Sequence, residues 1–414
     1  MLDIKIIRQN PEKIKTACQN RGVKVDIDKL LKLDERRRDL IQKVEKLRAE
    51  KKKGTIKEIK ELRKKKQMIK KLEIELKKVE NEFQELMYRV PNLPFDDVPI
   101  GKDESGNVVV REVGEKPKFD FQPKDYLEIA NDLIDTKRGA KTSGSRFYYL
   151  KGKVALLELE LINFAVKFLT DEENIKKIIQ EKGLNISPKP FIPVVPPLML
   201  KPEMMRGVGY LDQAPDETYY LEKDNLYLIG TAEHSLIAMH ANEILKEEDL
   251  PLRYVGLPCS SFRREAGSYG KDVRGIFRVH QFEKVEMVSF SLPETSQKEH
   301  QLLIALEEEM AKKLNLPYRI VQICTGELGY PSAATFDIEV WIPSQKRYRE
   351  VGSSSNCTDF QSRRLNIRYR NKDNKIIFLH TLNATALAMP RTIIAIIENY
   401  QKKDGTFDWP FRET

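Results

Sequence analysis

The chain has 414 residues, of which 40% are apolar and 33% are charged, and its net charge is +9. This length accommodates two to four domains of roughly 100–200 residues each. No apolar run approaches the roughly 18 residues of a membrane-spanning helix, the N-terminal segment lacks the apolar stretch of a secretory signal, and 20 glycines and 21 prolines exclude collagen-like chains. We therefore expect a globular, cytoplasmic protein with no membrane partner.

The cysteines and histidines predict neither a disulfide framework nor a zinc site. The sequence contains no C-x-x-C pair and no H-E-x-x-H motif. The four cysteines, Cys18, Cys259, Cys324 and Cys357, lie far apart along the chain. Such spacing is typical of reduced thiols in a reducing compartment.

The positive charge is concentrated in one segment near the N-terminus. Residues 43–78 contain 16 Lys and Arg against 6 Asp and Glu, a surplus of ten positive charges, so the rest of the chain is close to neutral. A local positive field attracts polyanions over a Debye length of about 10 Å. Two interpretations stay open, a surface that binds nucleic acid and a lysine-rich helix face that only contacts solvent.

The same segment has the apolar spacing of a coiled coil. Upstream of Gly54, the residues Leu33, Leu40, Val44 and Leu47 follow a heptad pattern that also includes Arg37. Downstream, seven residues repeat in steps of three and four, and these are Ile69, Leu72, Leu76, Val79, Phe83, Leu86 and Val90. Because glycine favours a break, we predict an antiparallel helical hairpin with its lysines near the tip. A dimerising coiled coil is the alternative.

A proline-rich linker, VPNLPFDDVPIG, divides the chain into an N-terminal domain, residues 1–100, and a second domain, residues 101–414. In the second domain we expect helices at 125–136, 153–182 and 295–314. Strand-like runs follow from residue 217, and the segment 382–403 is expected to form a last helix that contains Pro390. Because helices seldom separate the strands, the pattern predicts an α+β fold with an antiparallel sheet flanked by helices.

Chemically, the most informative segment is SSFRREAGSYGKDVRGIFRVHQFEKVEM. Arginine offers a planar fork of donors for a phosphate or a carboxylate, and strand alternation is expected to place Arg263 and Glu265 on one face. Phe282 is available to stack on a base. The alternative is a surface hairpin held by salt bridges.

The short motif FRREAG within this segment resembles part of a known family. It is similar to motif 2 of class II aminoacyl-tRNA synthetases, and its continuation through GIFRVHQFEKVE resembles the bacterial type of the seryl-tRNA synthetase family. GTAE resembles that family's serine-binding loop, and REVGSSSNCTDFQSRR resembles its nucleotide and metal segment. FIPVVPPLM, with Pro197, resembles motif 1, and TLNATALAMPRTIIAIIENYQ resembles motif 3. A basic N-terminal hairpin is typical of the family's tRNA-binding arm.

The resemblance implies a serine–tRNA ligase that uses ATP and Mg²⁺. L-serine and ATP form seryl-adenylate, which esterifies the 3′ end of tRNA(Ser), and also of tRNA(Sec) in organisms that have it. The family's motif 1 further implies a homodimer. Arg263 and Arg391 are the implied catalytic residues, clamping the α-phosphate and the γ-phosphate, and Glu350 and Ser353 are the implied Mg²⁺ ligands.

The resemblance also implies two substrate subsites. The implied ATP-binding residues are Arg263, Arg264, Glu265, Val279, Phe282, Glu350, Val351, Gly352, Ser353 and Arg391. The implied residues for L-serine are Thr231, Ala232, Glu233, Glu286, Asn383 and Thr385. A site of this kind rejects alanine because buried polar groups would lose the partner hydroxyl.

Three rival functions share some of these sequence features. The first is another class II synthetase with a helical arm, such as the phenylalanine-type α subunit, whose pocket should be apolar, in contrast to Asn383 and Thr385. The second is an inactive RNA-binding paralogue, against which Arg263, Glu265 and Arg391 argue. The third is an amino acid:carrier-protein ligase, which would lack the arm.

Overall fold

The computed structural model describes residues 1–53, 59–212, 214–266, 272 and 274–410. The chain divides into two compact units, Met1–Leu93 and Pro94–Thr414. The boundary therefore lies ahead of residue 100, because Phe95 and Val98 pack on Val321 and Ala334 of the second unit.

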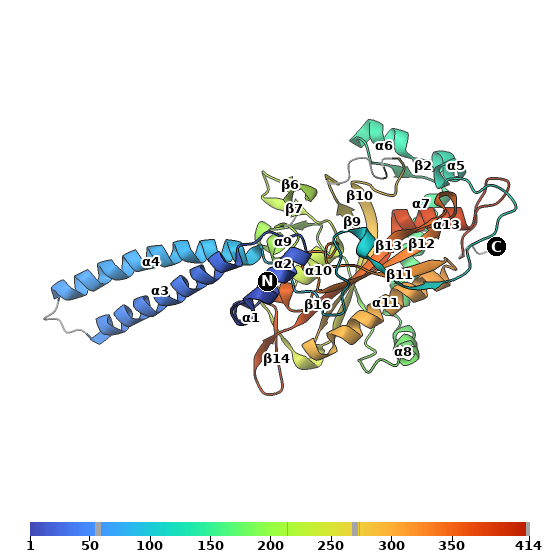
Figure 1. The fold of residues 1–414 in the computed structure, drawn as a ribbon. Helices are drawn as coiled ribbons and strands as arrows, with labels where there is room; N and C mark the ends of the chain where they lie inside the picture. The colour runs from blue at the N-terminus through green and yellow to red at the C-terminus, as the bar shows by residue number, and fades with distance from the viewer. Residues whose placement is uncertain (54–58, 213, 267–271, 273, 411–414) are drawn as a thin grey trace. The chain divides into compact units, whose positions relative to one another are not determined.

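The first unit is helical, with α1 (Ile4–Gln9), α2 (Pro11–Asn20), α3 (Ile27–Lys53) and α4 (Ile59–Tyr88). The two long helices run antiparallel side by side, as the heptad pattern predicts (Figure 1). Ile69, Phe83 and Val90 of the seam are buried. The predicted hairpin tip, which includes Gly54, lies outside the described residues.

One core position of α3 differs from the expected pattern. Asp34 is 1% exposed, whereas Leu33 is half-buried. The Asp34 carboxylate accepts hydrogen bonds from Arg8 at 2.6 Å and 2.9 Å and from Arg38 at 3.2 Å. Burial opposes its ionisation, but Arg8 holds the pKa of Asp34 below its usual range. A cluster of charged side chains around Asp34 is thus buried where the pattern places Leu33 in the core. It joins α1 to α3.

The second unit is built on an eight-stranded sheet in the order β1-β11-β12-β13-β16-β10-β9-β4. Neighbouring strands are antiparallel except β4 and β9, so the predicted α+β class with an antiparallel sheet is confirmed. The strands are β1 (Val108–Val113), β4 (Ile192–Val194), β9 (Leu252–Phe262), β10 (Gln281–Ser291), β11 (Tyr318–Gln322), β12 (Ala334–Ile342), β13 (Arg347–Asn356) and β16 (His380–Ala388).

Smaller sheets complete the second unit. One contains β8 (Ile244–Lys246), β14 (Arg368–Arg370) and β15 (Ile376–Phe378), and another contains β5 (Met199–Leu200), β6 (Tyr220–Leu221) and β7 (Leu226–Leu228). The short pair consists of β2 (Ile134–Asp135) and β3 (Tyr149–Leu150).

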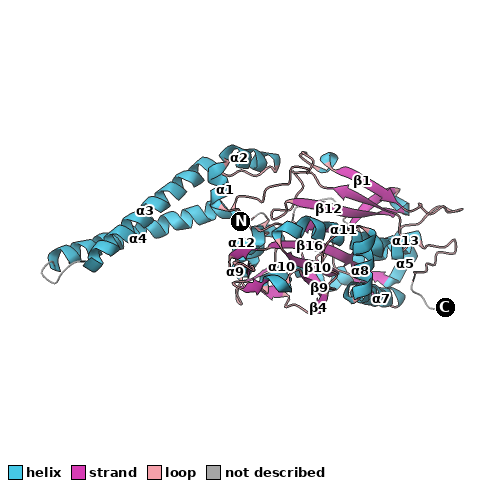
Figure 2. Ribbon diagram, turned by 90° about the horizontal axis from the view of Figure 1, so that it is seen from below, coloured by secondary structure: helices cyan, strands magenta, loops and turns pink. Residues whose placement is uncertain are grey.

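Helices cover one face of the large sheet and bury its apolar side. α7 (Lys153–Thr170), α11 (Ser296–Lys313) and α13 (Met389–Asn399) pack against the strands on this face (Figure 2). The remaining helices are α5 (Tyr126–Ala130), α6 (Thr136–Ser143), α8 (Glu172–Glu181), α9 (Pro202–Val208), α10 (Ala232–Ala238) and α12 (Phe360–Leu365). Among the described residues, no helix combines the length and the apolarity that crossing a membrane requires.

The expected last helix is wrong in its first half. His380–Ala388 forms β16, a central strand that pairs with β10 and β13, and α13 begins only at Met389. The alanines and leucines of this segment are buried on both faces of the sheet, and such continuous burial removes the alternation that identifies a strand. Pro390 consequently lies in the first turn of α13, where its missing N–H has no cost.

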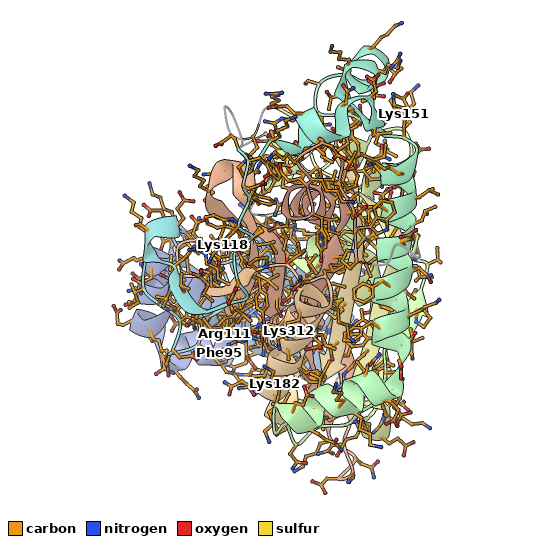
Figure 3. The ribbon with its side chains drawn as sticks, turned by 90° about the vertical axis from the view of Figure 1, so that its right-hand side faces the viewer. Phe95, Arg111, Lys118, Lys151, Lys182 and Lys312 are labelled. Carbon is orange, nitrogen blue, oxygen red and sulfur yellow. The ribbon has the colours of Figure 1, made fainter. Side chains whose placement is uncertain are left out.

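Two neighbouring glutamates of α11 lie in opposite environments. Glu308 pairs with Arg111 of β1 at 2.6 Å and with Lys182, just after α8, at 3.5 Å. Figure 3 labels these two cations, Arg111 and Lys182. Burial opposes the ionisation of Glu308, but Arg111 lowers its pKa below the usual range. Neither carboxyl oxygen of Glu307 has a hydrogen-bond partner among the described residues, and burial raises the pKa of Glu307 well above its usual range, with Asp337 adding to it. Burial without a hydrogen-bond partner therefore favours the neutral form of Glu307.

This contrast predicts opposite effects of two matched substitutions on stability. A raised pKa contributes stability that is present below about pH 4.5 and is lost as the pH rises. Glu307→Gln should therefore raise the free energy of unfolding at pH 8 by about 1 kcal/mol or more and change little at pH 4.5, because one pKa unit corresponds to about 1.4 kcal/mol. Urea denaturation at both pH values measures this difference.

Glu308→Gln is the control in the same helix. It removes a charge that stabilises the fold above the ordinary glutamate pKa, so it should lower the free energy of unfolding at pH 8 and do so less at low pH. Loss of stability at pH 8 in Glu307→Gln would contradict the neutral state of Glu307.

Candidate active site

The open face of the large sheet carries a cleft of about 1530 Å³. Strand alternation explains its polar lining, because Thr335, Asp337 and Glu339 of β12 face the cleft while Ile338 and Val340 enter the core. β10 contributes alternate residues in the same way, whereas β13 lines the cleft with the consecutive residues 347–353 and β16 adds further side chains. The cleft thus brings together side chains from segments that are far apart in the sequence.

One end of the cleft is built on the start of α10. Thr231 caps this helix, and its hydroxyl accepts a hydrogen bond from the Glu233 backbone N–H at 3.3 Å. The Glu233 carboxylate is 2% exposed and accepts from the Tyr210 hydroxyl at 3.1 Å and from the Gln361 amide at 2.8 Å. Burial raises the pKa of Glu233 to about 7, and the charge of Glu286 adds to this shift. A carboxylate in this state gains by binding an ammonium group.

Glu286 and Thr385 face each other across the β10–β16 ladder beside Glu233. The Lys284 ammonium contacts the Glu286 carboxylate at 2.6 Å, and the Thr385 hydroxyl donates to it at 3.5 Å. Asn383 lines the same end of the cleft, and its amide donates to the Cys357 sulfur at 3.7 Å. This end is small, polar and enclosed.

Arg263 occupies the middle of the cleft, directly after β9 ends. Its Nε donates to the Gly230 carbonyl at 3.1 Å, and its guanidinium lies 5.2 Å from the centre of the Phe282 ring. The expected strand alternation of Arg263 and Glu265 is wrong, because β9 ends at Phe262 and Glu265 has a φ of +53°. The two side chains nevertheless line the same cleft. Arg278 donates to the Glu265 carboxylate at 2.7 Å.

The other end of the cleft holds Arg391 and Glu350. The Arg391 guanidinium donates to the Glu350 carboxylate at 2.8 Å and lies 4.9 Å from the centre of the Phe277 ring. Burial opposes ionisation, but Arg391 lowers the pKa of Glu350 below its usual range. On the neighbouring strand, burial and the charge of Glu350 raise the pKa of Asp337 well above its usual range, although Ser353 donates to it.

Oxygen ligands of this kind suit Mg²⁺, and two carboxylates that compete for ionisation gain from a cation between them. No group of three or more His, Cys, Asp or Glu residues that could hold a metal occurs in the described part of the chain. The available set of Glu350, Ser353 and Asp337 therefore fits a Mg²⁺ that takes its remaining ligands from phosphates and water.

Most of the predicted site residues line the cleft, and two do not. Ala232, the first residue of α10, is buried in the core. Arg264 is exposed, and its Nε donates to the Thr218 carbonyl at 3.2 Å while its guanidinium lies over the Tyr219 ring. The predicted residues that line the cleft are Thr231, Glu233, Arg263, Glu265, Val279, Phe282, Glu286, Glu350, Val351, Gly352, Ser353, Asn383, Thr385 and Arg391.

Several residues that complete the site were not predicted. Lys284 and Arg278 lie within the arginine-rich segment, so their charge was an available signal. Asp337 alternates with apolar residues on β12, which is also readable from sequence. Tyr210 and Gln361 carry no such signal, because only the fold brings them to Glu233.

Comparison with known proteins decides the family. The seryl-tRNA synthetase N-terminal domain matches residues 1–94, and the class II tRNA synthetase core domain (G, H, P, S and T) matches residues 219–400. The chain belongs to the seryl-tRNA synthetase family. It is 44% identical to the serine–tRNA ligase of Thermobifida fusca, over 98% of this chain and 95% of that protein.

Two solved structures extend this likeness to the fold. The seryl-tRNA synthetase of Pyrococcus horikoshii, complexed with ATP, has a TM-score of 0.87 at 40% identity and covers 99% of this chain and 96% of its own. The cytoplasmic serine–tRNA ligase of Naegleria fowleri, in complex with AMP, has a TM-score of 0.84 at 32% identity, with the same coverage. The predicted family and its class II fold are thus confirmed.

The elevated pKa of Glu233 predicts a pH-dependent response to an amine-bearing substrate. Only the ionised carboxylate attracts an ammonium group, so kcat/KM for L-serine should fall as the pH drops below about 7, by up to about tenfold per pH unit. Pyrophosphate exchange between pH 5.5 and 8.5 measures this profile. Burial also raises the pKa of Glu286, although Lys284 opposes the shift, so protonation of Glu286 should add to the loss of activity at acid pH.

Glu233→Gln is the control for this profile. The amide cannot ionise, so the inflection near pH 7 should disappear from whatever exchange activity remains. A wild-type profile that is flat from pH 6 to pH 8 would contradict the role of Glu233.

Proposed function

We propose that this member of the seryl-tRNA synthetase family is a serine–tRNA ligase that activates L-serine with ATP and transfers it to tRNA(Ser). The observation that carries the proposal is the single cleft in which two buried carboxylates, Glu233 and Glu286, stand next to the guanidinium groups of Arg263 and Arg391. The first pair suits an amino acid, and the second pair suits a triphosphate.

In the first step the serine carboxylate attacks the α-phosphorus of ATP, and pyrophosphate leaves. Negative charge grows on the phosphoryl oxygens, so the residues that act are cations placed before the substrates bind. Arg263 clamps the α-phosphate and the serine carboxylate, and Arg391 contacts the γ-phosphate. Phe282 stacks on the adenine, and Glu265 accepts from its exocyclic amine. No protein nucleophile is required.

Glu350 and Ser353 are the proposed Mg²⁺ ligands, and Asp337 lies beside Ser353 on the paired strand. When bound, the ion neutralises charge on the phosphates. The Arg391–Glu350 contact keeps both side chains oriented toward the triphosphate end of the cleft.

The serine subsite selects by hydrogen bonding and by volume. Glu233 and Glu286 hold the amine and the hydroxyl, while Asn383 and Thr385 close the end of the pocket. Alanine would leave these buried groups without a partner, and such sites discriminate by about 10⁴–10⁵. Threonine would be excluded by its extra methyl group.

In the second step a hydroxyl of the 3′-terminal adenosine attacks the seryl carbonyl, and AMP leaves. We assign tRNA binding to the unit Met1–Leu93 and catalysis to Pro94–Thr414, in place of the boundary at residue 100. tRNA(Sec) would be a second substrate in an organism that has it. Because the reaction needs ATP and tRNA, we assign it to the cytoplasm.

The proposal includes a homodimer formed around the segment that resembles motif 1. Large apolar side chains are exposed on α7 and around β4, among them Leu156 at 57%, Leu159 at 62% and Val195 at 78%. α7 contacts β4, so these residues belong to one surface of the second unit. A second copy of the chain would remove this apolar surface from water.

Amino-acid-dependent pyrophosphate exchange tests the proposed function directly. L-serine alone should support exchange among the standard amino acids, and Arg263→Ala should reduce it by about 10²–10³ because one preorganised cation is lost. tRNA binding should persist in this variant. Arg370→Ala, which replaces an exposed residue of β14, is the control, and its rate of exchange should match that of the wild type. Exchange with phenylalanine and none with serine would refute the assignment.

Substitutions in the arm should weaken tRNA binding and leave serine activation unchanged. The variant replaces four exposed lysines of α4 by glutamine, namely Lys64, Lys66, Lys70 and Lys71. It should weaken tRNA binding and flatten its salt dependence. The slope of log affinity against log salt concentration should fall by about 0.7–0.9 for each phosphate contact that is lost. Pyrophosphate exchange should not change. Filter binding at salt concentrations from about 50 mM to 200 mM measures the effect.

The matched control replaces four exposed lysines of α8 and α11, which are Lys176, Lys177, Lys312 and Lys313. An equal loss of tRNA affinity in the two variants would mean that total charge, and not the arm, determines binding.

A further inference from the structure

The backbone of one residue, Gly230, connects the two halves of the cleft. The Gly230 carbonyl accepts a hydrogen bond from Arg263 Nε at 3.1 Å, and the Gly230 N–H donates to Nδ1 of His234 at 3.3 Å. Arg263 thus contacts the carbonyl of a residue whose N–H is held by an imidazole.

The imidazole of His234 also contacts the serine side of the cleft. Its ring centre lies 5.2 Å from that of Tyr210, with the planes tilted by 38°. The Tyr210 hydroxyl donates to both carboxylate oxygens of Glu233, at 3.1 Å and 3.2 Å. His234 therefore packs against the residue that orients the proposed ammonium receptor.

The environment of His234 keeps its acceptor available. Nδ1 accepts from Gly230, so the ring proton is on Nε2. His234 is 5% exposed, and burial lowers its pKa to about 3, with the positive charges of Arg263 and Lys284 adding to the effect. The ring is consequently neutral at any working pH and binds Gly230 throughout.

We propose that His234 is a positioning residue for both substrates, which holds Arg263 through the Gly230 backbone and Glu233 through Tyr210. The inference rests on the proposed roles of Arg263 and Glu233. A histidine that only fills the core would not be expected to contact both the glycine that supports Arg263 and the phenol that orients Glu233. The two contacts use different parts of the ring, the Nδ1 lone pair and the aromatic face, so they can be separated by substitution.

Two variants separate the contacts. His234→Phe keeps an aromatic ring against Tyr210 and removes the acceptor, so KM for ATP should rise by about threefold to tenfold, as expected for one hydrogen bond. KM for serine should rise less, because Glu233 and Tyr210 still hold the amine. His234→Asn places an amide oxygen near the position of Nδ1 and removes the ring, so the effect on the two KM values should be reversed. Both values come from pyrophosphate exchange normalised to active sites.

A double-mutant cycle tests the serine branch separately. Tyr210→Phe removes the hydroxyl and keeps the ring, so it should raise KM for serine alone. If His234 acts through Tyr210, the effects of His234→Asn and Tyr210→Phe on KM for serine will not add. Even if a His234 variant fails to fold, Tyr210→Phe by itself tests the contact between Tyr210 and Glu233 on which this branch depends.

The outcomes distinguish this inference from the proposed function. Failure of the wild type to exchange with serine would overturn the function. Given wild-type exchange, variants that lose thermal stability but keep both KM values, or that raise both equally, would show a structural histidine and overturn the inference. An unchanged KM for serine in Tyr210→Phe would also overturn it.

Discussion

Charge pairing on the open face of the large sheet is the constraint on which the site depends. A cleft that must receive a triphosphate and an amino acid needs cations and carboxylates in an enclosed place, where an unpaired charge is costly. The protein pairs them with each other, as in Arg391 with Glu350 and Lys284 with Glu286. The geometry is therefore set before the substrates arrive, and substrate groups replace contacts that already exist. Such preorganised charge is the main source of rate acceleration open to a reaction that uses no protein nucleophile.

The apolar face of the same sheet makes this arrangement rigid. α7, α11 and α13 pack their apolar side chains under the strands, and α13 carries Arg391 near its start. A shift of α13 would move Arg391, the proposed partner of the γ-phosphate, so packing in the core fixes the spacing of charges in the cleft. Alternation along β12 connects the two faces of the sheet. Ile338 and Val340 are packed in the core, and this directs the side chains of the neighbouring residues into the cleft.

The sequence predicts those parts of the molecule in which one physical pattern dominates. The heptad spacing predicted the helical hairpin. The resemblance of the arginine-rich segment to motif 2 and to the seryl-tRNA synthetase family pointed to Arg263, Phe282 and Glu286, which line one cleft. Prediction failed where tertiary context overrides the pattern. The segment Thr381–Ala388 is buried on both faces and shows no alternation, so it resembled a helix. Asp34 enters the arm core only because arginines from α1 and α3 neutralise it. Tyr210 and Gln361 reach Glu233 through the fold, which no local spacing encodes.

The two units use different interactions for the two kinds of substrate, long-range charge attraction for tRNA and short hydrogen bonds for the amino acid. Lysines of the arm are exposed and act through a field that salt screens within about 8–10 Å, which favours fast capture of a long polyanion but carries little selectivity. Glu233, at 2% exposure, acts through short hydrogen bonds in a medium that salt barely reaches, and there a single missing hydroxyl leaves a buried group without its partner. Discrimination among small amino acids therefore has to take place in the cleft. The arm can only determine which polyanion is presented to the cleft. This division explains why nearly all of the chain's net positive charge lies in one segment, while the second unit keeps its charges paired.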